Sequence, residues 1–361
     1  MKLCLLCNVV INNNSKQYRN KKYCTDKCRT TAHDKKKSQI TRTERKRANL
    51  RQNDEVLYLV RQCKRAKTVQ ILNGHNFDSF EETMELVRNR PKGDVKLCHI
   101  APVKGKKSTG LLHCQNLFYG GSHQNRKFGK SYISGGLSIR NKKLKKKWSV
   151  TEDLSINDIL IMIEKYLVDI IPEYIKTCPV RKSKKVQVVS KIIGLDESKN
   201  FDELMLCSYT SLVEEWAKTS KTKQPVISYA KESKYIAYMD SLTRFIRYGG
   251  DNVSTLRKLR KIMVIAYMAL ERVQRSETYN KLFYVKYEPL INHKYGQAML
   301  KNPDDWSVFK DLIYRTAFKV LQGDHLDTKK FRKEIMSYLT FPEKAWLNKD
   351  IPYEISCSYP L

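Results

Sequence analysis

Residues 95–127 read VKLCHIAPVKGKKSTGLLHCQNLFYGGSHQNRK, and their pattern predicts a compact unit of strands and a helix. Residues 95–103 are rich in aliphatic side chains, which is typical of a strand. A basic loop with glycines at 104–110 leads to a second apolar run at 111–117, which predicts another strand. Residues 118–127 then predict a short helix despite their glycines. The expected order is therefore strand, loop, strand and helix.

Three polar side chains lie at defined positions along these predicted strands and helix. His99 lies on the first predicted strand, Asn116 ends the second, and Asn125 lies nine residues further on, in the predicted helix. This arrangement resembles the ββα-metal motif of the HNH, or His-Me finger, nucleases of phage type. The resemblance covers roughly residues 94–130, about a tenth of the chain.

The resemblance implies a role for each matching residue. His99 would be the general base that deprotonates water, because an imidazole titrates near neutral pH. Asn116 would orient His99 through a side-chain hydrogen bond. One divalent ion, Mg²⁺ or Mn²⁺, would neutralise charge on the scissile phosphate. Asn125 matches the helical metal ligand, and His123 competes with it for this role.

The residue before the base departs from the family pattern. The family has Asp, His or Asn there, whereas this chain has Cys98, a soft ligand that suits zinc better than magnesium. Asn125 or His123, together with Cys98 or water, would hold the catalytic ion. An alternative stays open: Cys98 and His99 could face His113 and Cys114 across a hairpin and bind a second structural zinc, with His123 as a further ligand.

The positive charge of the chain is concentrated in its first part. The formal net charge is +32, and residues 1–150 hold 35 Lys and Arg against 10 Asp and Glu. No Asp or Glu occurs between residues 95 and 151. Such an excess favours a polyanionic partner, and nucleic acid is the one we expect. The expected phosphate-binding residues are Lys104, Lys106, Lys107, Arg126, Lys127, Lys130, Lys142, Lys143, Lys145, Lys146 and Lys147.

Four cysteines near the N-terminus have metal-ligand spacing. Cys4 and Cys7 form one close pair, and Cys24 and Cys28 form the second. Two such pairs can bring four thiolates to the corners of a tetrahedron around a structural Zn²⁺ ion. The basic segment after Cys28 predicts a helix leaving the second pair, as in treble-clef fingers. Because all four positions are filled by protein, we expect no catalysis at this ion.

The whole sequence predicts an α+β fold in four parts. These are a Cys4 zinc finger at 1–40, a basic helical connector at 41–75, a ββα-metal, HNH-like nucleic-acid-binding domain at 76–150, and a mainly α-helical C-terminal domain at 151–361. Helical patterns recur near 151–171, 201–219, 228–247, 254–275, 306–321 and 328–339, whereas residues 186–193 predict a strand. Aromatic residues at helical spacing, such as Tyr235 and Tyr238, are more typical of a core than of base stacking.

These patterns favour a DNA-binding, HNH-like endonuclease that hydrolyses phosphodiester bonds. The alternative is a nuclease-inactive, zinc-containing DNA-binding or regulatory protein of phage type, and an RNA-directed factor is a weaker third class. We expect double-stranded DNA as the partner and no membrane association, since no run of about 18 apolar residues occurs. Dilute cysteines at metal spacing favour an intracellular, cytoplasmic location, the bacterial host cytoplasm if the protein is phage-encoded. The helical domain leaves protein partners and oligomerisation open.

Overall fold

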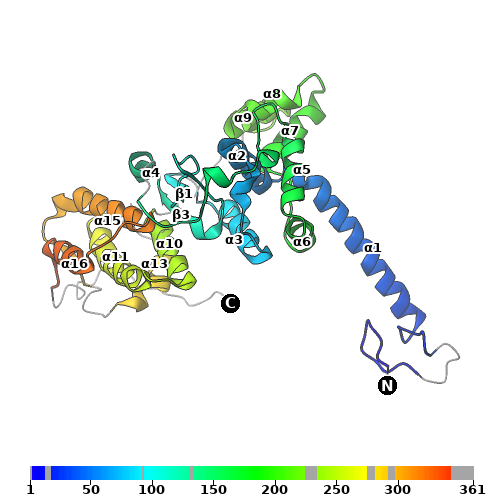
Figure 1. The fold of residues 1–361 in the computed structure, drawn as a ribbon, viewed down its shortest axis with the longest axis horizontal. Coiled ribbons are helices and arrows are strands. Elements are labelled where there is room, and N and C mark those ends of the chain that lie inside the picture. Colours follow the sequence, from blue (N-terminus) through cyan, green and yellow to red (C-terminus); the bar gives the residue numbers. More distant parts are fainter. Residues whose placement is uncertain are drawn as a thin grey trace. The chain divides into compact units, whose positions relative to one another are not determined.

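The computed structural model describes residues 2–12, 18–91, 93–129, 133–223, 234–274, 281–291 and 297–342. It is mostly helical (Figure 1), its described residues form three short two-stranded sheets, and four cysteines near the N-terminus form a cluster. Among these residues, no helix combines the length and the apolar character that crossing a bilayer requires. The described fold is thus mainly helical, and its strands are short.

The chain divides into two compact units, each built from two segments. Unit 1 comprises residues 1–61 and 153–226, and unit 2 comprises residues 62–152 and 227–361. This division differs from the four consecutive parts expected from the sequence. The expected helical domain is shared between the units, and its second portion, from residue 227 on, belongs with the ββα segment.

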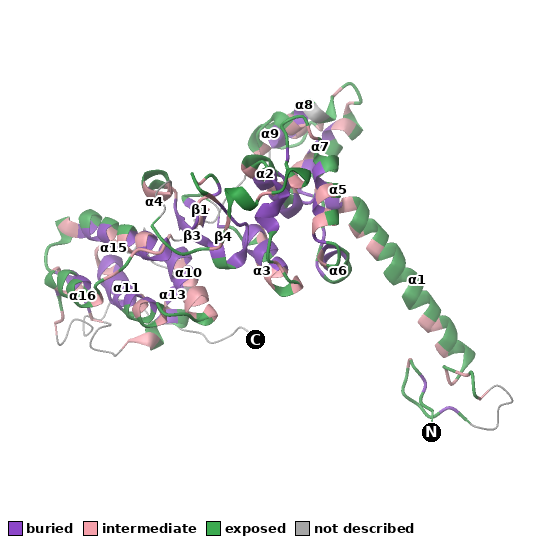
Figure 2. Cartoon of the chain, in the orientation of Figure 1, coloured by how far each residue is buried: buried purple, intermediate pink, exposed green. Residues whose placement is uncertain are grey.

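After the cysteine cluster, the described residues of unit 1 form helices joined by loops, without strands. Its helix α1 contains no buried residue, and most of its residues are exposed (Figure 2). The expected continuous connector helix is interrupted, because Asn53 caps a new helix by accepting a hydrogen bond from the Val56 N–H at 3.1 Å. The helices are α1 (Asp26–Asn49), η1 (Leu50–Gln52), α2 (Asp54–Ala66, which continues into unit 2), α5 (Ile156–Tyr166), α6 (Ile170–Thr177), α7 (Lys184–Leu195), α8 (Phe201–Leu206) and α9 (Tyr209–Thr219).

Helix α7 corrects the strand expected at residues 186–193. Its valines and isoleucines have β propensity, but the buried ones, Val186, Val189 and Ile192, recur at helical spacing. Ser183 also caps the helix by accepting a hydrogen bond from the Val186 N–H at 2.9 Å. Burial of this face against Leu204 and Leu212 therefore overrides the local preference.

Unit 2 holds the strands and the largest apolar core. This core is centred on α11, in which residues 262–271 are all buried. Tyr235 and Tyr238 are also buried in it, which agrees with the expected core role of the aromatic stripe.

The helices of the first segment of unit 2 are η2 (Val69–Leu72), α3 (Phe77–Arg88), η3 (Cys114–Asn116), α4 (Ser122–Phe128), η4 (Asn141–Lys143) and η5 (Lys146–Trp148). Those of the second are α10 (Lys234–Tyr248), α11 (Val253–Val273), α13 (Lys281–Tyr287), η6 (Glu288–Leu290), η7 (Pro303–Asp305), α15 (Trp306–Leu321) and α16 (Thr328–Ser337). The strands are β1 (Val95–His99), β2 (Ser108–Gly110), β3 (Leu117–Gly121), β4 (Ser138–Arg140), β5 (Met299–Leu300) and β6 (Leu339–Thr340).

A hairpin followed by a helix forms at residues 95–128. Strands β1 and β3 pair antiparallel, with Val95 opposite Gly121 and His99 opposite Leu117, and α4 packs back on both strands. The second strand of the hairpin begins at Leu117, the last residue of the run 111–117 that the sequence predicts as a strand. Asn116 therefore lies in the turn that enters β3, and does not end the strand.

Helix α10 covers the edge of β3 that β1 leaves free. Tyr238 Oη accepts a hydrogen bond from the Gly121 N–H at 2.8 Å, and Ser241 Oγ accepts one from the Tyr119 N–H at 2.9 Å. Arg244 donates to the carbonyl oxygens of Leu117 and, at 2.6 Å, Cys114. These three side chains recur every third residue on α10, so one helix face satisfies the backbone of a strand edge.

Candidate functional site

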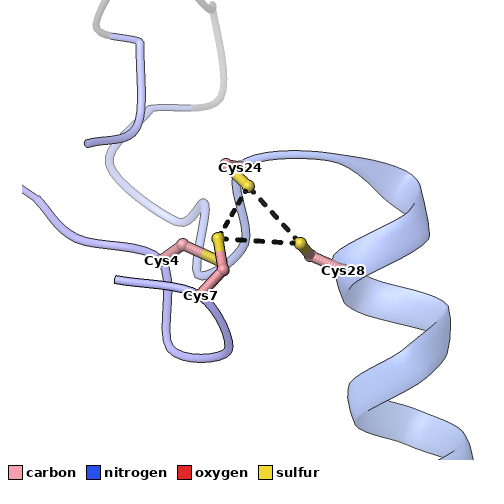
Figure 3. A group of neighbouring side chains, drawn as sticks. All are labelled: Cys4, Cys7, Cys24 and Cys28. Carbon is pink, nitrogen blue, oxygen red and sulfur yellow. Dashed lines mark hydrogen bonds between the residues drawn. The ribbon is translucent and has the colours of Figure 1, made fainter. Parts of the chain in front are cut away.

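The four N-terminal cysteines converge as their spacing predicts. The sulfur atoms of Cys4, Cys7, Cys24 and Cys28 all lie within 4.8 Å of one another (Figure 3). The Sγ atom of Cys7 is 3.4 Å from that of Cys24 and 3.8 Å from that of Cys28, and the Cys24–Cys28 distance is 3.5 Å. A tetrahedron of sulfur atoms around zinc has edges of about 3.8 Å, so this set fits the ion.

Local backbone geometry brings the two pairs together. The turn after Cys4 closes through hydrogen bonds from the Asn8 N–H to the Cys4 carbonyl at 3.0 Å and from the Cys4 N–H to the Val9 carbonyl at 2.8 Å. Asn8 adopts a φ of 58°, a left-handed conformation that asparagine tolerates. On the other side, Thr25 caps α1 by accepting a hydrogen bond from the Cys28 N–H at 3.2 Å. The first turn of α1 therefore directs Cys28 toward the other sulfur atoms.

The electrostatics of the cluster favour a cation. Burial opposes ionisation of the Cys4 thiol, but backbone N–H groups of Cys24, Cys7 and Leu6 outweigh it and lower the pKa of Cys4 to about 6. The neighbouring thiols of Cys7 and Cys28, together with burial, raise the pKa of Cys24 to about 12. Four sulfur atoms cannot all carry charge at these distances unless a dication neutralises them. The cluster is thus consistent with a closed, structural zinc site.

His99 is the last residue of β1, as expected for the candidate base. Its Nε2 atom is buried and has no hydrogen-bond partner among the described residues. Burial, with a smaller contribution from the charge of Arg65, lowers the pKa of His99 to about 3. The imidazole is therefore neutral at physiological pH.

Asn116 does not hold the ring of His99, which corrects the expected side-chain hydrogen bond. Its Nδ2 atom donates to the carbonyl oxygens of Leu111 at 2.7 Å and Ala101 at 3.2 Å, and its Oδ1 accepts from the Ala101 N–H at 2.9 Å. The side chain is completely buried. Asn116 consequently closes the long loop between β1 and β3 through the loop's own backbone.

The backbone of Gly136 packs tightly against this closure. Its φ is +70°, and a Cβ atom there would lie 2.4 Å from the Asn116 Oδ1 atom and 2.7 Å from the Ala101 nitrogen. A larger residue at this position would therefore push into the closed loop. Gly136, which follows the ββα segment, thus contributes to fixing the loop after His99.

Cys98 points away from the candidate site. It is buried within the core of unit 2 beside Ile100 and Phe118, and burial raises the pKa of its thiol to about 12. The expectation that Cys98 holds a catalytic ion therefore fails in this geometry. Adjacent strand residues face opposite sides of a sheet, so Cys98 and His99 cannot both face the same cleft.

The alternative second zinc site does not assemble either. Among the described residues, the N-terminal cysteines are the one group of His, Cys, Asp or Glu with metal-ligand geometry. His113 is buried and stacks on His75, with ring centroids 4.6 Å apart. These rings pack in the interior and do not join Cys98 and Cys114 around an ion.

The other predicted residues lie mostly on the surface. On α4, His123 is exposed and Asn125 is half-buried, and among the described residues no hydrogen bond joins either of them to His99. Lys130 falls outside the described residues. The remaining expected phosphate-binding residues are all exposed, namely Lys104, Lys106, Lys107, Arg126, Lys127, Lys142, Lys143, Lys145, Lys146 and Lys147.

Comparison with known proteins adds no relative: no family model, curated protein or solved structure matches this chain. Only the geometry of the described residues therefore bears on the candidate site. Sequence reasoning missed Arg244, Ser241 and Tyr238, which hold β3 from a helix more than a hundred residues away. Their spacing of three residues on one helix face was the available signal, but it does not identify the strand edge they serve.

We expect the stability of unit 2 to fall in mild acid because of His75. Its Nε2–H donates to the Leu112 carbonyl at 2.8 Å, and burial, followed by the charge of His113, lowers its pKa to about 4. Because the unfolded histidine titrates near 6.5, the unfolded state gains protons first as the pH falls. Stability present above pH 6.5 is thus lost toward pH 4, by about 3 kcal/mol.

Thermal unfolding at pH 7.0 and pH 4.5 checks this expectation for His75. His75→Gln should make the pH dependence of the midpoint shallower without abolishing it, because buried His99, whose pKa is lowered to about 3, keeps its own contribution, whereas the exposed His325→Gln should leave the dependence as in the wild type. An equally steep dependence in His75→Gln would show that other groups are responsible.

Proposed function

We propose that this chain is a DNA-binding endonuclease in which the β1–β3–α4 segment hydrolyses phosphodiester bonds. The observation that carries the proposal is the hairpin with a helix folded back on it, with His99 at the end of its first strand. The Nε2 atom of His99 is buried without a partner among the described residues. An unpaired buried polar atom costs free energy, so its retention favours a functional role.

In the proposed reaction, His99 accepts a proton from water. As the O–H bond breaks, the proton passes to Nε2 and the water oxygen bonds to phosphorus; the bond from phosphorus to the leaving oxygen breaks, and that oxygen keeps the electron pair and takes a proton from solvent. The neutral ring has its lone pair available, although a pKa near 3 makes it a weak base. A bound phosphate beside the ring would raise this pKa, since the anion stabilises the imidazolium.

The described residues fit a catalytic Mg²⁺ or Mn²⁺ ion poorly. Such ions prefer carboxylate and other oxygen ligands, but Cys98 is buried in the core and no Asp or Glu occurs between residues 95 and 151. Asn125 supplies an amide oxygen and His123 an imidazole, both on α4. We therefore assign no step of the proposed reaction to an ion.

A second candidate function is DNA binding without cleavage. The burial of Cys98 and the use of the Asn116 amide within the loop favour it, because both residues serve packing in the structure. In this case the ββα segment is a docking module, and the zinc cluster and the exposed lysines provide the affinity for nucleic acid.

Plasmid cleavage separates the two functions. Supercoiled plasmid is incubated with the purified protein in Mg²⁺ or Mn²⁺ buffer, together with His99→Ala and with His325→Ala as the matched control. We expect nicking by the wild type and the control, and a loss of at least about 100-fold in His99→Ala, because a general base contributes 10²–10⁴-fold. Equal retention of plasmid by all three proteins without any nicking would favour the second function.

A further inference from the structure

Two basic runs that are far apart in the sequence form one surface in unit 2. Strands β2 and β4 pair antiparallel, with Ser108 opposite Arg140 and Gly110 opposite Ser138. The residues just before Ser108 and just after Arg140 therefore lie at the same end of this two-stranded ribbon. Residues 104–107 and 140–147 together are called the basic ribbon below.

Asn141 joins the two basic runs through hydrogen bonds. Its backbone N–H donates to the Lys107 carbonyl at 3.0 Å, and its Nδ2 lies 3.3 Å from the carbonyl oxygens of both Gly105 and Lys106. Its Oδ1 accepts a hydrogen bond from the Thr109 hydroxyl at 2.9 Å. A single neutral side chain thus fixes the loop that carries Lys106 and Lys107 beside the run that begins at Arg140.

The second run is anchored along its length. The Lys145 N–H donates to the side-chain oxygen of the buried Gln70 at 2.6 Å, and the Thr68 hydroxyl donates to the Trp148 carbonyl at 3.1 Å. The Val150 N–H then donates to the Lys67 carbonyl at 2.9 Å. These lysines are therefore held on an ordered backbone, which lowers the entropy cost of binding a partner.

The charges on the basic ribbon are exposed and of one sign. None of its cations takes part in an ion pair among the described residues, and the segment around them contains no Asp or Glu. Solvated protein surfaces normally mix both signs, so a cluster of this kind points to an anionic partner. Its exposed cations are Lys104, Lys106, Lys107, Arg140, Lys142, Lys143, Lys145, Lys146 and Lys147.

We propose that the basic ribbon is the surface that holds the phosphates of B-form duplex DNA. This inference rests on the DNA-binding part of the proposed function and is independent of cleavage. A duplex carries one charge per about 1.7 Å of its axis, which suits several cations gathered at one end of a ribbon. The cations lie at one end of the short two-stranded ribbon β2–β4, and the major groove of B-form DNA is wide enough to admit such an element, whereas the deep, narrow groove of A-form RNA is not.

A charge-matched pair of variants tests the location of the surface. Lys107, Lys142 and Lys143 are changed to glutamine in one protein, and Lys329, Lys330 and Lys333, all exposed on α16, in the other. Both lose three charges. We expect the ribbon variant to bind a 30-base-pair DNA duplex at least tenfold more weakly at 150 mM salt, and its plot of log Kd against log salt to become less steep by about two to three. The α16 variant should stay within about twofold of wild type.

Asn141→Ala tests whether the arrangement of the ribbon matters beyond its charge. This variant keeps every cation but removes the side-chain hydrogen bonds of Asn141 to Gly105, Lys106 and Thr109. We therefore expect about fivefold weaker binding to duplex DNA and a smaller preference for DNA over duplex RNA of the same sequence. An unchanged far-UV circular dichroism spectrum establishes that the variant is folded. Dissociation constants are measured by fluorescence anisotropy for DNA, RNA and single-stranded DNA.

Four outcomes would overturn the proposal in different ways. Equal losses in the ribbon and α16 variants would mean that only net charge matters. Equal or tighter binding of duplex RNA or single-stranded DNA by the wild type would assign the surface to another partner. Failure of the wild type to bind any DNA would overturn the proposed function as well, whereas wild-type binding with an unaffected ribbon variant would overturn this inference alone.

Discussion

Replacing Cys24 with serine should remove the zinc ion and unfold the N-terminal module. We expect the metal content to fall from one ion per chain to near zero after dialysis, because the four sulfur atoms form a single closed site. Only Cys4 and Ile11 are buried among residues 2–12 and 18–25, so burial cannot replace the metal. Zinc binding in such modules is worth about 10–16 kcal/mol, which makes this the largest effect that we expect.

Elemental analysis and hydrogen exchange measure the result of the Cys24 substitution. Amide protection should disappear in residues 2–12 and 18–28, while the core of unit 2 keeps its protection because it shares no residue with the cluster. Cys207→Ser is the matched control, since that thiol is exposed and lies outside the cluster. A Cys24→Ser protein that kept a full complement of zinc, or a metal-free wild type with a protected N-terminus, would contradict the assignment.

Asn116→Ala should destabilise unit 2 by about 3–5 kcal/mol. The substitution removes three side-chain hydrogen bonds and leaves the N–H and carbonyl of Ala101 and the carbonyl of Leu111 without them. Each unsatisfied buried group costs about 1–3 kcal/mol. Urea unfolding measures the loss as a lower midpoint with an unchanged slope.

The control for Asn116 is Asn125→Ala on α4. Asn125 is half-buried, and we expect its substitution to change stability by less than about 1 kcal/mol. If Asn116→Ala instead lowered DNA cleavage while stability stayed near the wild-type value, Asn116 would act on the ring of His99, as the HNH resemblance first suggested. The two measurements on the same variant therefore separate closure of the loop from orientation of the base.

Local patterns predicted those features that depend on neighbours in the sequence. The zinc cluster follows from two close cysteine pairs, and α15 occupies residues 306–321 as its apolar spacing predicts. The strand expected at 186–193 was wrong because helix capping by Ser183 and one buried face outweighed the β propensity of valine and isoleucine.

The candidate site could be predicted only in part. His99 lies on a strand and Asn125 in a helix as expected, but β2 occupies residues 108–110 within the expected loop, and β3 covers residues 117–121 in place of the expected strand at 111–117. The burial of Cys98 and the partners of Asn116 depend on which face of β1 meets the core and on how the long loop closes. These properties arise from contacts between distant segments, such as Arg244 with Leu117, for which the sequence carries no local signal.

The covering of β3 by α10 has a consequence for synthesis of the protein on the ribosome. Ser241 follows its partner Tyr119 by 122 residues, so a nascent hairpin must wait on the order of 10 s for the helix that completes it. During that interval the outer side of β3 is an open template to which another nascent chain can add a strand. Slow elongation or truncation before residue 244 should therefore send this protein toward aggregates, and full-length chains should escape them.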